Sequence, residues 1–283
     1  MTRGEPLFLG VDGGGTGCRV ALWNAGGTLL ARADGGPANV SSDFDGACGH
    51  ILAAIAEVEA VAGQSVTRAV AHLGLAGVMS PKTGAAVAAR MPMVRCRVTD
   101  DRPTTIAGAL GGADGAVLAV GTGSFVGVQR DGQVRAVGGW GFQVSDNASA
   151  AWIGRAGLAA TLDAVDGLAP HGAMAQALLQ RFGGDPNAIV AFAAVARPVE
   201  YGALAPLVLG AGDDPAALAI MRQGAEWLDR ALHALDHDDT LPLCLIGGLG
   251  PRYRAALDRP GRRFVAPKGT ALDGALVLAR GAT

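Results

Sequence analysis

The stretch at residues 7–20, "LFLGVDGGGTGCRV", places one acid and four glycines between two apolar runs. A second stretch at residues 116–128, "AVLAVGTGSFVGV", repeats the pattern with hydroxyl side chains in place of the acid. Around each glycine run the sequence predicts the order strand, turn, strand, turn, strand. This recurrence predicts two copies of one supersecondary unit.

The glycine turns are candidate phosphate sites. Glycine tolerates positive φ and leaves room for a ligand, so successive backbone N–H groups can converge on an anion. A lone glycine hairpin is more often only a tight turn, but the repeat favours a ligand. Neither turn ends in the Walker G-K-[ST] sequence or completes a dinucleotide fingerprint. The candidate residues are Gly13, Gly14, Gly15, Thr16, Gly121, Thr122, Gly123 and Ser124.

Asp12 follows the first strand directly and precedes the glycines. A carboxylate beside polyphosphate is favourable when Mg²⁺ lies between them, and Mg²⁺ commonly takes one or two carboxylates together with phosphate oxygens. A solvated turn aspartate is the alternative. We therefore expect Asp12 to be a magnesium site.

Composition excludes several classes of protein. Half of the 283 residues are hydrophobic, 17% are charged and the net charge is −2, which predicts a globular chain without a nucleic-acid surface. No apolar run is long enough to span a membrane, and the N-terminal sequence lacks a targeting pattern, so a cytoplasmic protein is expected. The four cysteines form no C-x-x-C pair, which argues against a zinc or iron–sulfur site.

The remaining chain alternates strands and helices at first and then becomes mostly helical, which predicts a layered α/β fold with a hinge near residues 105–115. A further strand enters the glycines of "LCLIGGLG" at 243–250, and "TALDGALVLAR" at 270–280 predicts a closing helix. The helices expected after residue 145 are 147–164, 172–182, 186–197 and 215–236.

The ordered motifs "GVDGGGTGCRV", "VTDD", "VGTGSFVGV", "GGWGFQVSDNASAAWIG", "PVEYGALAP" and "LIGGLG" cover nearly the whole chain. In this order they resemble the sugar-kinase branch of the actin/hexokinase superfamily, specifically bacterial glucosamine and N-acetylglucosamine kinases of the BadF/BadG/BcrA/BcrD ATPase group. The resemblance implies two ribonuclease H-like domains of the actin-like ATPase type, at 1–107 and 108–283, with an interdomain cleft. It also implies a homodimer that uses ATP and Mg²⁺.

The resemblance also implies residue roles. Asp12 and the two glycine turns would hold the metal and phosphates, Gly247 and Gly248 would lie under the adenosine, and Asn39 would bind sugar. Asp101 would be the catalytic base, since the attacking hydroxyl must lose its proton. We expect only one of Asp100 and Asp101 to reach the sugar, because consecutive strand residues point to opposite faces. Alternatively, Asp101 caps a helix that begins near Thr104.

The loop around Trp140 is the segment from which we predict the substrate. Gly139, Trp140, Gly141 and Asp146 would bind the sugar, with Asp146 also capping the next helix, although Trp140 could instead be a core aromatic. Many N-acetylglucosamine kinases have a glycine-aspartate-glutamate-glycine-serine run here, whereas this chain has "SDNAS". The difference favours glucosamine, whose ammonium group suits Asp146, over N-acetylglucosamine.

Two other functions are open alternatives. An ATPase that activates a partner enzyme would need cluster-ligating cysteines. A sugar-responsive regulator would need a DNA-binding segment ahead of the first glycine turn, and only a few residues precede it in this sequence.

Overall fold

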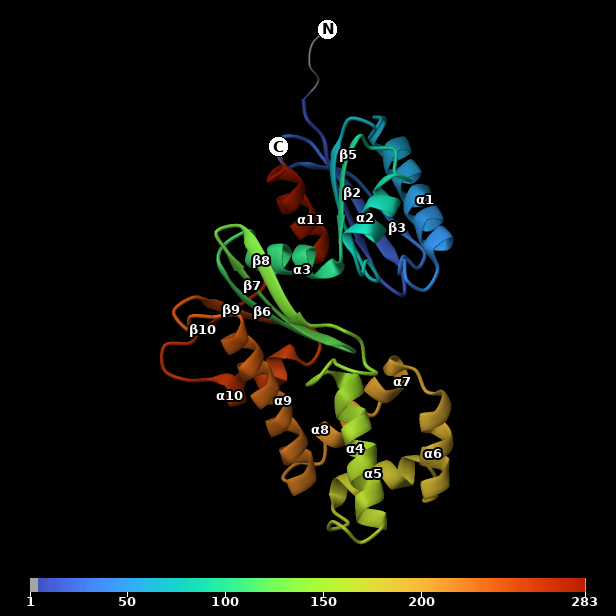
Figure 1. The fold of residues 1–283 in the computed structure, drawn as a ribbon, viewed down its shortest axis with the longest axis vertical. Helices are drawn as coiled ribbons and strands as arrows, with labels where there is room; N and C mark the ends of the chain where they lie inside the picture. The colour runs from blue at the N-terminus through green and yellow to red at the C-terminus, as the bar shows by residue number, and fades with distance from the viewer. Residues whose placement is uncertain (1–4, 283) are drawn as a thin grey trace. The chain divides into compact units, whose positions relative to one another are not determined.

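The computed structural model describes residues 5–282, and these form two compact units. The first contains the described residues up to Gly115, the short segment Gln129–Val134 and the residues from Ala266 onward. The second contains Ala116–Val128 and Arg135–Val265. Each unit is built on a five-stranded sheet with helices against it (Figure 1).

The sheet of the first unit has the strand order β3-β2-β1-β4-β5. Strands β1, β2 and β3 form an antiparallel meander, whereas β4 and β5 continue parallel to β1. The carboxyl ends of β1, β4 and β5 therefore lie at one edge of the sheet. The strands are β1 (Phe8–Gly13), β2 (Cys18–Trp23), β3 (Leu29–Gly35), β4 (Val70–Leu75) and β5 (Arg95–Thr99).

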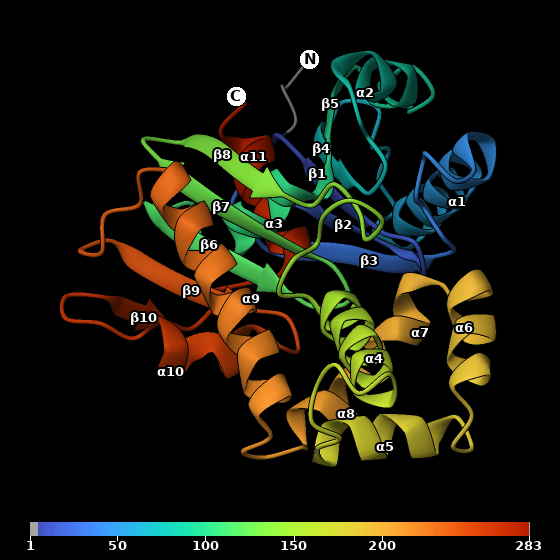
Figure 2. The same cartoon turned by 60° about the horizontal axis from the view of Figure 1, so that its bottom comes forward.

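Helices cover both faces of this sheet (Figure 2). Helix α1 (Phe44–Ala62) packs on β2 and β3, whereas α3 (Asp101–Leu110) and α11 (Ala271–Arg280) pack on β1 and β4. Helix α2 (Pro81–Ala88) lies against β5. The strand residues alternate accordingly: Leu9 and Val11 belong to the core that includes α1, whereas Gly10 faces α11.

Helices α3 and α11 approach each other closely because glycines meet backbone at their crossing. A Cβ at Gly108 would collide with the carbonyl oxygen of Thr270, and a Cβ at Gly274 with that of Thr104. Bare backbone at both positions therefore fixes the distance between the helices. Helix α3, which begins with Asp101, is held on the sheet partly by this crossing.

The sheet of the second unit has the order β10-β9-β6-β7-β8, with β9 parallel to both β6 and β10. When it is read from β8, this order repeats that of the first sheet, as the internal repeat in the sequence predicts. The strands are β6 (Gly115–Val120), β7 (Ser124–Arg130), β8 (Gln133–Gly138), β9 (Pro242–Ile246) and β10 (Arg263–Val265).

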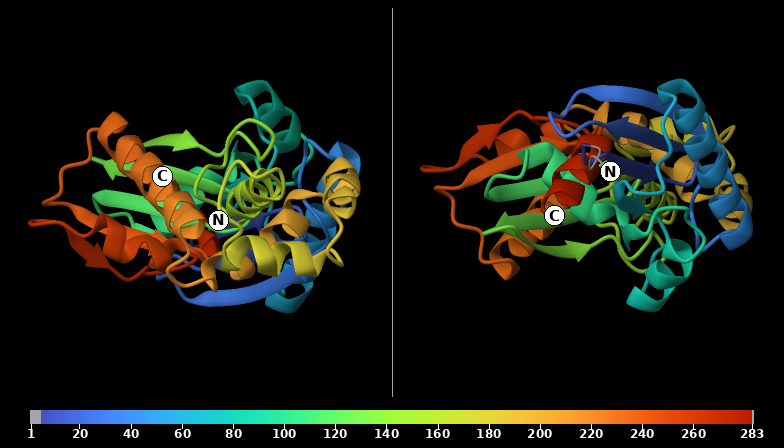
Figure 3. Two further views of the ribbon diagram at one scale, coloured as in Figure 1. Left: turned by 90° about the horizontal axis from the view of Figure 1, so that it is seen from below. Right: turned by 90° about the horizontal axis from the view of Figure 1, so that it is seen from above.

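Most helices of the chain belong to the second unit. Helix α9 (Pro215–Ala234) lies across one face of its sheet, in orange in Figure 3, and contributes Leu228 and Leu232 to the core. A group of helices around α4 follows the loop after β8 (Figure 1). Its members are α4 (Ala150–Val165), α5 (Ala173–Arg181), α6 (Pro186–Val195), α7 (Pro198–Gly202) and α8 (Ala205–Leu209).

The elements that the sequence predicts agree with these bounds to within a few residues, whereas α2, α7, α8 and β10 are not among them. The units are divided differently from the expected ranges 1–107 and 108–283, because the terminal helix α11 packs on β1 and β4 and so groups with the first unit. Residues 1–4 and 283 of those ranges lie outside the described residues. Within residues 5–282, no helix combines the length and apolarity needed to cross a bilayer.

Candidate active site

The first glycine turn is closed by its own backbone. The N–H of Gly14 donates to the carbonyl of Gly17 at 2.9 Å, and the carbonyl of Gly14 accepts the N–H of Ala38 at 2.9 Å. Gly15 and Thr16 are exposed at the tip, and a Cβ at Gly15 would meet nothing within 4 Å. These two residues are therefore the part of the turn open to a ligand.

Left-handed φ is not the reason for glycine in the two turns. Positive φ occurs at none of the glycines in residues 13–15 or at Gly121 and Gly123, so the expectation based on conformational freedom is wrong there. At Gly13 the small size of glycine is needed instead, because a Cβ there would lie 2.6 Å from Cδ2 of Leu75. At Gly15 and Gly121 the corresponding space is empty, which leaves room for a bound group.

Asp12 is a buried residue of β1, not a solvated turn aspartate. Its Oδ2 lies 2.7 Å from Nη2 of Arg19, which is its register partner on β2. Burial raises the pKa of Asp12, while the Arg19 guanidinium lowers it. A carboxylate that directly precedes the open part of the glycine turn is a group of the kind that holds Mg²⁺. Arg19 was missed by the sequence reasoning, although its position seven residues after Asp12, across a hairpin, was a usable signal.

Asp100 and Asp101 have separate roles at the start of α3. Strand β5 ends at Thr99, Asp100 is the N-cap, and its Oδ1 accepts the N–H of Arg102 at 2.9 Å. The alternative that Asp101 caps a helix near Thr104 is wrong, because Asp100 caps and the helix begins at Asp101. Asp100 and Asp101 do not point to opposite faces of a strand, since neither aspartate lies in β5.

The carboxyl of Asp101 has the electrostatics of a base. Its pKa is raised, first by burial and then by the negative charges of Asp100 and Asp12, whereas a hydrogen bond from its own backbone N–H and the charge of Arg102 oppose the shift. A carboxylate whose proton affinity is raised accepts a proton from a hydroxyl more readily. The first unit therefore brings together Asp12, the first turn and Asp101.

Asn39 lies beside the first turn. Its neighbour Ala38 donates to Gly14, and its Oδ1 accepts both the N–H of Ser41 at 3.0 Å and the hydroxyl of Ser41 at 2.8 Å. A Cβ at Gly77 would collide with that oxygen, so the amide is tightly held. With Oδ1 occupied, the amide nitrogen of Asn39 is the group left to donate to a ligand.

The second glycine turn joins directly to the start of α4. The N–H of Gly121 donates to the carbonyl of Gly123 at 2.9 Å, and the carbonyl of Gly121 accepts the N–H of Ala150 at 2.8 Å. Thr122 is exposed, whereas Ser124 is buried and donates its hydroxyl proton to the carbonyl of Asn147. Thr122 is therefore the accessible hydroxyl of this turn, and Ser124 ties the turn to the following loop.

Asp146 lies against the second turn. A Cβ at Gly123 would lie 2.8 Å from Oδ2 of Asp146, and the carboxylate accepts hydrogen bonds from the backbones of Gly141 and Ser124. Burial raises the pKa of Asp146, and those hydrogen bonds lower it. Its Oδ1 is buried without a hydrogen-bond partner among the described residues. Because Asp146 is only 8% exposed, and buried polar atoms are normally hydrogen-bonded, this oxygen is a candidate acceptor for a hydrogen-bond donor of a ligand.

Asp146 does not cap helix α4, contrary to the sequence expectation. The helix begins at Ala150, and the hydroxyl of Ser149 accepts the N–H of Trp152 at 3.1 Å. Asp146 instead has φ +58 in the preceding loop, a left-handed conformation that aspartate adopts more readily than most residues other than glycine. The loop thus holds the carboxylate next to the second turn.

The glycines after β9 meet the second turn. Gly247 has φ +81, and a Cβ there would lie 3.1 Å from the nitrogen of Gly121 and would collide with the carbonyl of Val120. The N–H of Leu249 donates to Val120 at 3.0 Å. A Cβ at Gly248 would meet nothing within 4 Å, so this glycine borders open space.

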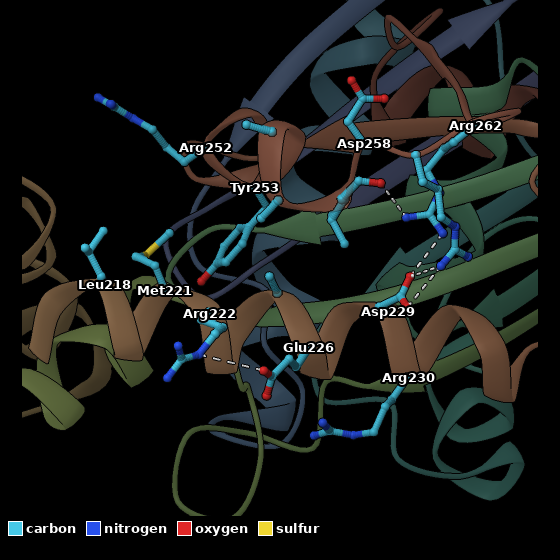
Figure 4. A pocket seen from close by; sticks show the side chains of 15 residues that line it. Leu218, Met221, Arg222, Glu226, Asp229, Arg230, Arg252, Tyr253, Asp258 and Arg262 are labelled. Atoms are coloured by element: carbon cyan, nitrogen blue, oxygen red, sulfur yellow. Dashed lines mark hydrogen bonds and ion pairs between the residues drawn. The ribbon is translucent and has the colours of Figure 1, made fainter. Parts of the chain in front are cut away.

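A cavity of about 650 Å³ opens beside this segment, between α9, the 3₁₀ turn η1 (Gly250–Tyr253) and α10 (Arg254–Leu257) (Figure 4). At one end, the buried Arg262 donates to Asp229 and Asp239 at 3.1 and 2.8 Å. Tyr253 also lines this cavity, and its hydroxyl group donates a hydrogen bond to the carbonyl of Ala148 at 2.8 Å. The cavity wall is therefore linked to the Asp146 loop.

Trp140 is not a core aromatic, since it is 64% exposed between Gly139 and Gly141, both of which have positive φ. It lines a pocket of about 340 Å³ together with Trp227 and Arg230. Trp152, in contrast, packs against the core of the second unit. The second unit therefore gathers the second turn, the glycines after β9 and the loop with Trp140 and Asp146.

Two sheets of this order with their glycine turns define the class of the protein: an α/β protein of the actin-like ATPase fold. The chain belongs to the BadF/BadG/BcrA/BcrD ATPase family, whose model matches residues 9–249.

Individual relatives agree with this assignment. The chain is 30% identical over 279 residues to the glucosamine kinase GspK of Vibrio cholerae, covering 96% of this chain and 95% of that protein. A crystal structure of a putative N-acetylglucosamine kinase from Chromobacterium violaceum has 37% identity and a TM-score of 0.83, covering 97% of this chain and 99% of that one. A ROK family glucokinase from Streptomyces griseus, at 19% identity and TM-score 0.55 with 97% and 99% coverage, shares the fold.

Proposed function

We propose that this protein is an ATP-dependent kinase that transfers the γ-phosphoryl group of ATP to the 6-hydroxyl of glucosamine. The observation that carries the proposal concerns the carboxylate of Asp101. Asp100, not Asp101, caps helix α3, and the pKa of Asp101 is raised by burial and by neighbouring carboxylates. The 30% identity to the Vibrio cholerae glucosamine kinase supports the same reaction.

In this reaction the carboxylate of Asp101 orients the 6-hydroxyl and accepts its proton. The O6–H bond breaks, a bond forms between O6 and the γ-phosphorus, and the bond from that phosphorus to the bridging oxygen breaks, releasing ADP. Most catalysis of phosphoryl transfer is positioning and charge stabilisation, so a fixed carboxylate at the start of a helix suits the task.

ATP would be bound by the parts already described. Gly15 and Thr16 in the first turn, and Thr122 with the space at Gly121 in the second, would contact phosphate oxygens. Gly248 and the cavity beside η1 would receive the nucleoside. Asp12 would hold Mg²⁺, which when bound neutralises charge on the phosphates.

The preference for glucosamine rests on Asp146. Its buried Oδ1 lacks a hydrogen-bond donor among the described residues, and a free ammonium group would supply one together with the opposite charge. Asn39 would donate to a sugar hydroxyl from its amide nitrogen. Trp140, exposed between two glycines, would offer an aromatic surface to the sugar.

N-acetylglucosamine is the second candidate substrate. The favouring observation is the 37% identity to the putative N-acetylglucosamine kinase of Chromobacterium violaceum. An acetamido N–H could also donate to Asp146, although without the charge. We further propose that the enzyme is a cytoplasmic homodimer.

The test is Mg²⁺-dependent release of ADP by the purified protein, with glucosamine, N-acetylglucosamine, glucose or no sugar present. The proposal predicts release that depends on sugar and is highest with glucosamine. Highest release with N-acetylglucosamine would keep the reaction and replace the substrate. Release that is independent of sugar would refute a sugar kinase and favour an ATPase of another role.

A further inference from the structure

His72 is a buried histidine in the middle of the first sheet. It belongs to β4 and is 2% exposed, and its Nε2 lies 3.1 Å from the hydroxyl oxygen of Thr99 at the end of β5. The hydroxyl of Thr99 in turn donates to the carbonyl of Asp100 at 2.8 Å. A chain of two hydrogen bonds therefore runs from the sheet to the residue before Asp101.

The direction of this chain fixes the state of the histidine. Because Thr99 uses its only proton on Asp100, it must accept from His72, so Nε2 carries the hydrogen. Burial lowers the pKa of His72 to about 4, with Arg97 adding to the effect, so the ring is neutral. The other nitrogen, Nδ1, is then an acceptor, and it is buried without a partner among the described residues.

An unsatisfied buried nitrogen is unfavourable for folding, and an aliphatic side chain at this position would avoid it. Unlike an aliphatic side chain, His72 makes a hydrogen bond to the hydroxyl of Thr99. That bond lies at the edge of the sheet where β1, β4 and β5 end: Asp12 is the register partner of Gly74, and Gly74 is the partner of Thr99.

The start of α3 is also held from its other side. The hydroxyls of Thr104 and Thr105 donate to the carbonyl of Asp101 at 3.0 and 2.8 Å. Thr104 is fully buried, and a Cβ at Gly74 would collide with its hydroxyl, so the helix sits directly on β4. Side-chain hydroxyls therefore hold the carbonyl oxygens of both Asp100 and Asp101.

We propose that His72 and Thr99 are positioning residues, whose hydrogen-bond chain to the carbonyl of Asp100 sets the orientation of the Asp101 carboxylate for phosphoryl transfer. The inference rests on the proposed function, because it requires Asp101 to be the base. Neither residue touches substrate; both act through Asp101.

Four single variants test the inference. Thr99→Val and His72→Leu remove the hydrogen bonds at nearly constant volume, whereas Thr99→Ser and His72→Gln keep a hydroxyl and a donor. We expect Thr99→Val and His72→Leu to lower kcat with glucosamine roughly 10- to 100-fold, as small misplacements of catalytic groups do. The KM for ATP should stay within about twofold, and the serine and glutamine variants should retain kcat within about threefold.

A double variant separates positioning from general damage. In the Asp101→Asn background, measured by transfer of radiolabelled phosphate, Thr99→Val should cause no further loss, because residues acting through one group are not additive. The inference is overturned by unchanged kcat in both Thr99→Val and His72→Leu, by equal losses in the serine and glutamine variants, or by the same fold-loss in the Asp101→Asn background. Should Thr99→Val fail to fold, His72→Leu takes its place in both comparisons.

Different results would refute the proposed function and the role of His72 and Thr99. Full activity of Asp101→Asn, or turnover of the unmodified protein that does not depend on sugar, would refute the proposed function and the inference with it. Loss of activity in Asp101→Asn with unchanged Thr99→Val and His72→Leu would refute the inference alone.

Discussion

Asp100 accepts the backbone N–H of Arg102 at 2.9 Å and the Nε of the same arginine at 2.8 Å, so it is both the N-cap of α3 and one half of an ion pair. This double contact occupies Asp100. The adjacent Asp101 is left without a capping role, and its pKa is raised by burial and by the charge of Asp100.

The first prediction concerns pH. Because a raised pKa means that Asp101 stays protonated to higher pH, kcat/KM should fall on the acid side above the usual titration range of a carboxyl group. Asp100→Asn keeps a side chain that can cap the helix but removes the neighbouring negative charge. The acid limb of the kcat/KM profile should therefore move to lower pH. A limb that stays in place or moves upward would contradict the assignment of Asp101 as the titrating base.

The second prediction concerns the base itself. Asp101→Asn keeps the size of the side chain and removes its ability to accept a proton. We expect kcat to fall about 10²- to 10⁴-fold while binding of ATP, measured by calorimetry, is nearly unchanged. A variant that keeps more than about a tenth of the rate would rule out Asp101 as the base.

The third prediction concerns the choice of sugar. Asp146→Asn keeps one oxygen acceptor for the backbone donors but removes the charge that would attract an ammonium group. The KM for glucosamine should rise roughly tenfold or more, whereas that for N-acetylglucosamine should change much less. Parallel steady-state titrations with both sugars measure the difference. Equal effects on the two sugars would exclude an ionic contact between Asp146 and the 2-amino group.

The fourth prediction concerns stability. Gly108→Ala would place a Cβ against the carbonyl of Thr270 where α3 crosses α11, and should lower the free energy of unfolding by roughly 1–3 kcal/mol or more. Gly49→Ala is the matched control: it lies on the exposed face of α1, and a Cβ there meets nothing within 4 Å. That variant should gain about 0.5–1 kcal/mol from helix propensity. Urea unfolding measures both, and equal effects would refute the close crossing.

The sequence predicts much of this fold because local patterns carry it. The two glycine turns indicate the internal repeat of the sequence, and the apolar runs around them form strands in the same order in both sheets. The grouping of elements into the two units depends on tertiary packing, which local patterns do not reveal. Helix α11 groups with the first unit because its side chains meet β1 and β4, which are far away in the sequence.

The site was predictable in its residue types more than in their geometry. Asp12, Asp101 and Asp146 could be picked out from their motifs, but the helix boundaries that separate Asp100 from Asp101 and Ser149 from Asp146 depend on backbone hydrogen bonds. Nothing in the sequence around His72 indicates the role proposed for it. Its bond to Thr99 joins residues 27 positions apart, which no local pattern reveals.

The most direct test of the central claim is to identify the product formed from ATP and glucosamine by phosphorus and proton nuclear magnetic resonance. The account predicts a single new phosphate ester, coupled to the two protons on carbon 6 of glucosamine, that appears in step with ADP. A phosphate on another carbon, or inorganic phosphate formed at the same rate with and without the sugar, would contradict it.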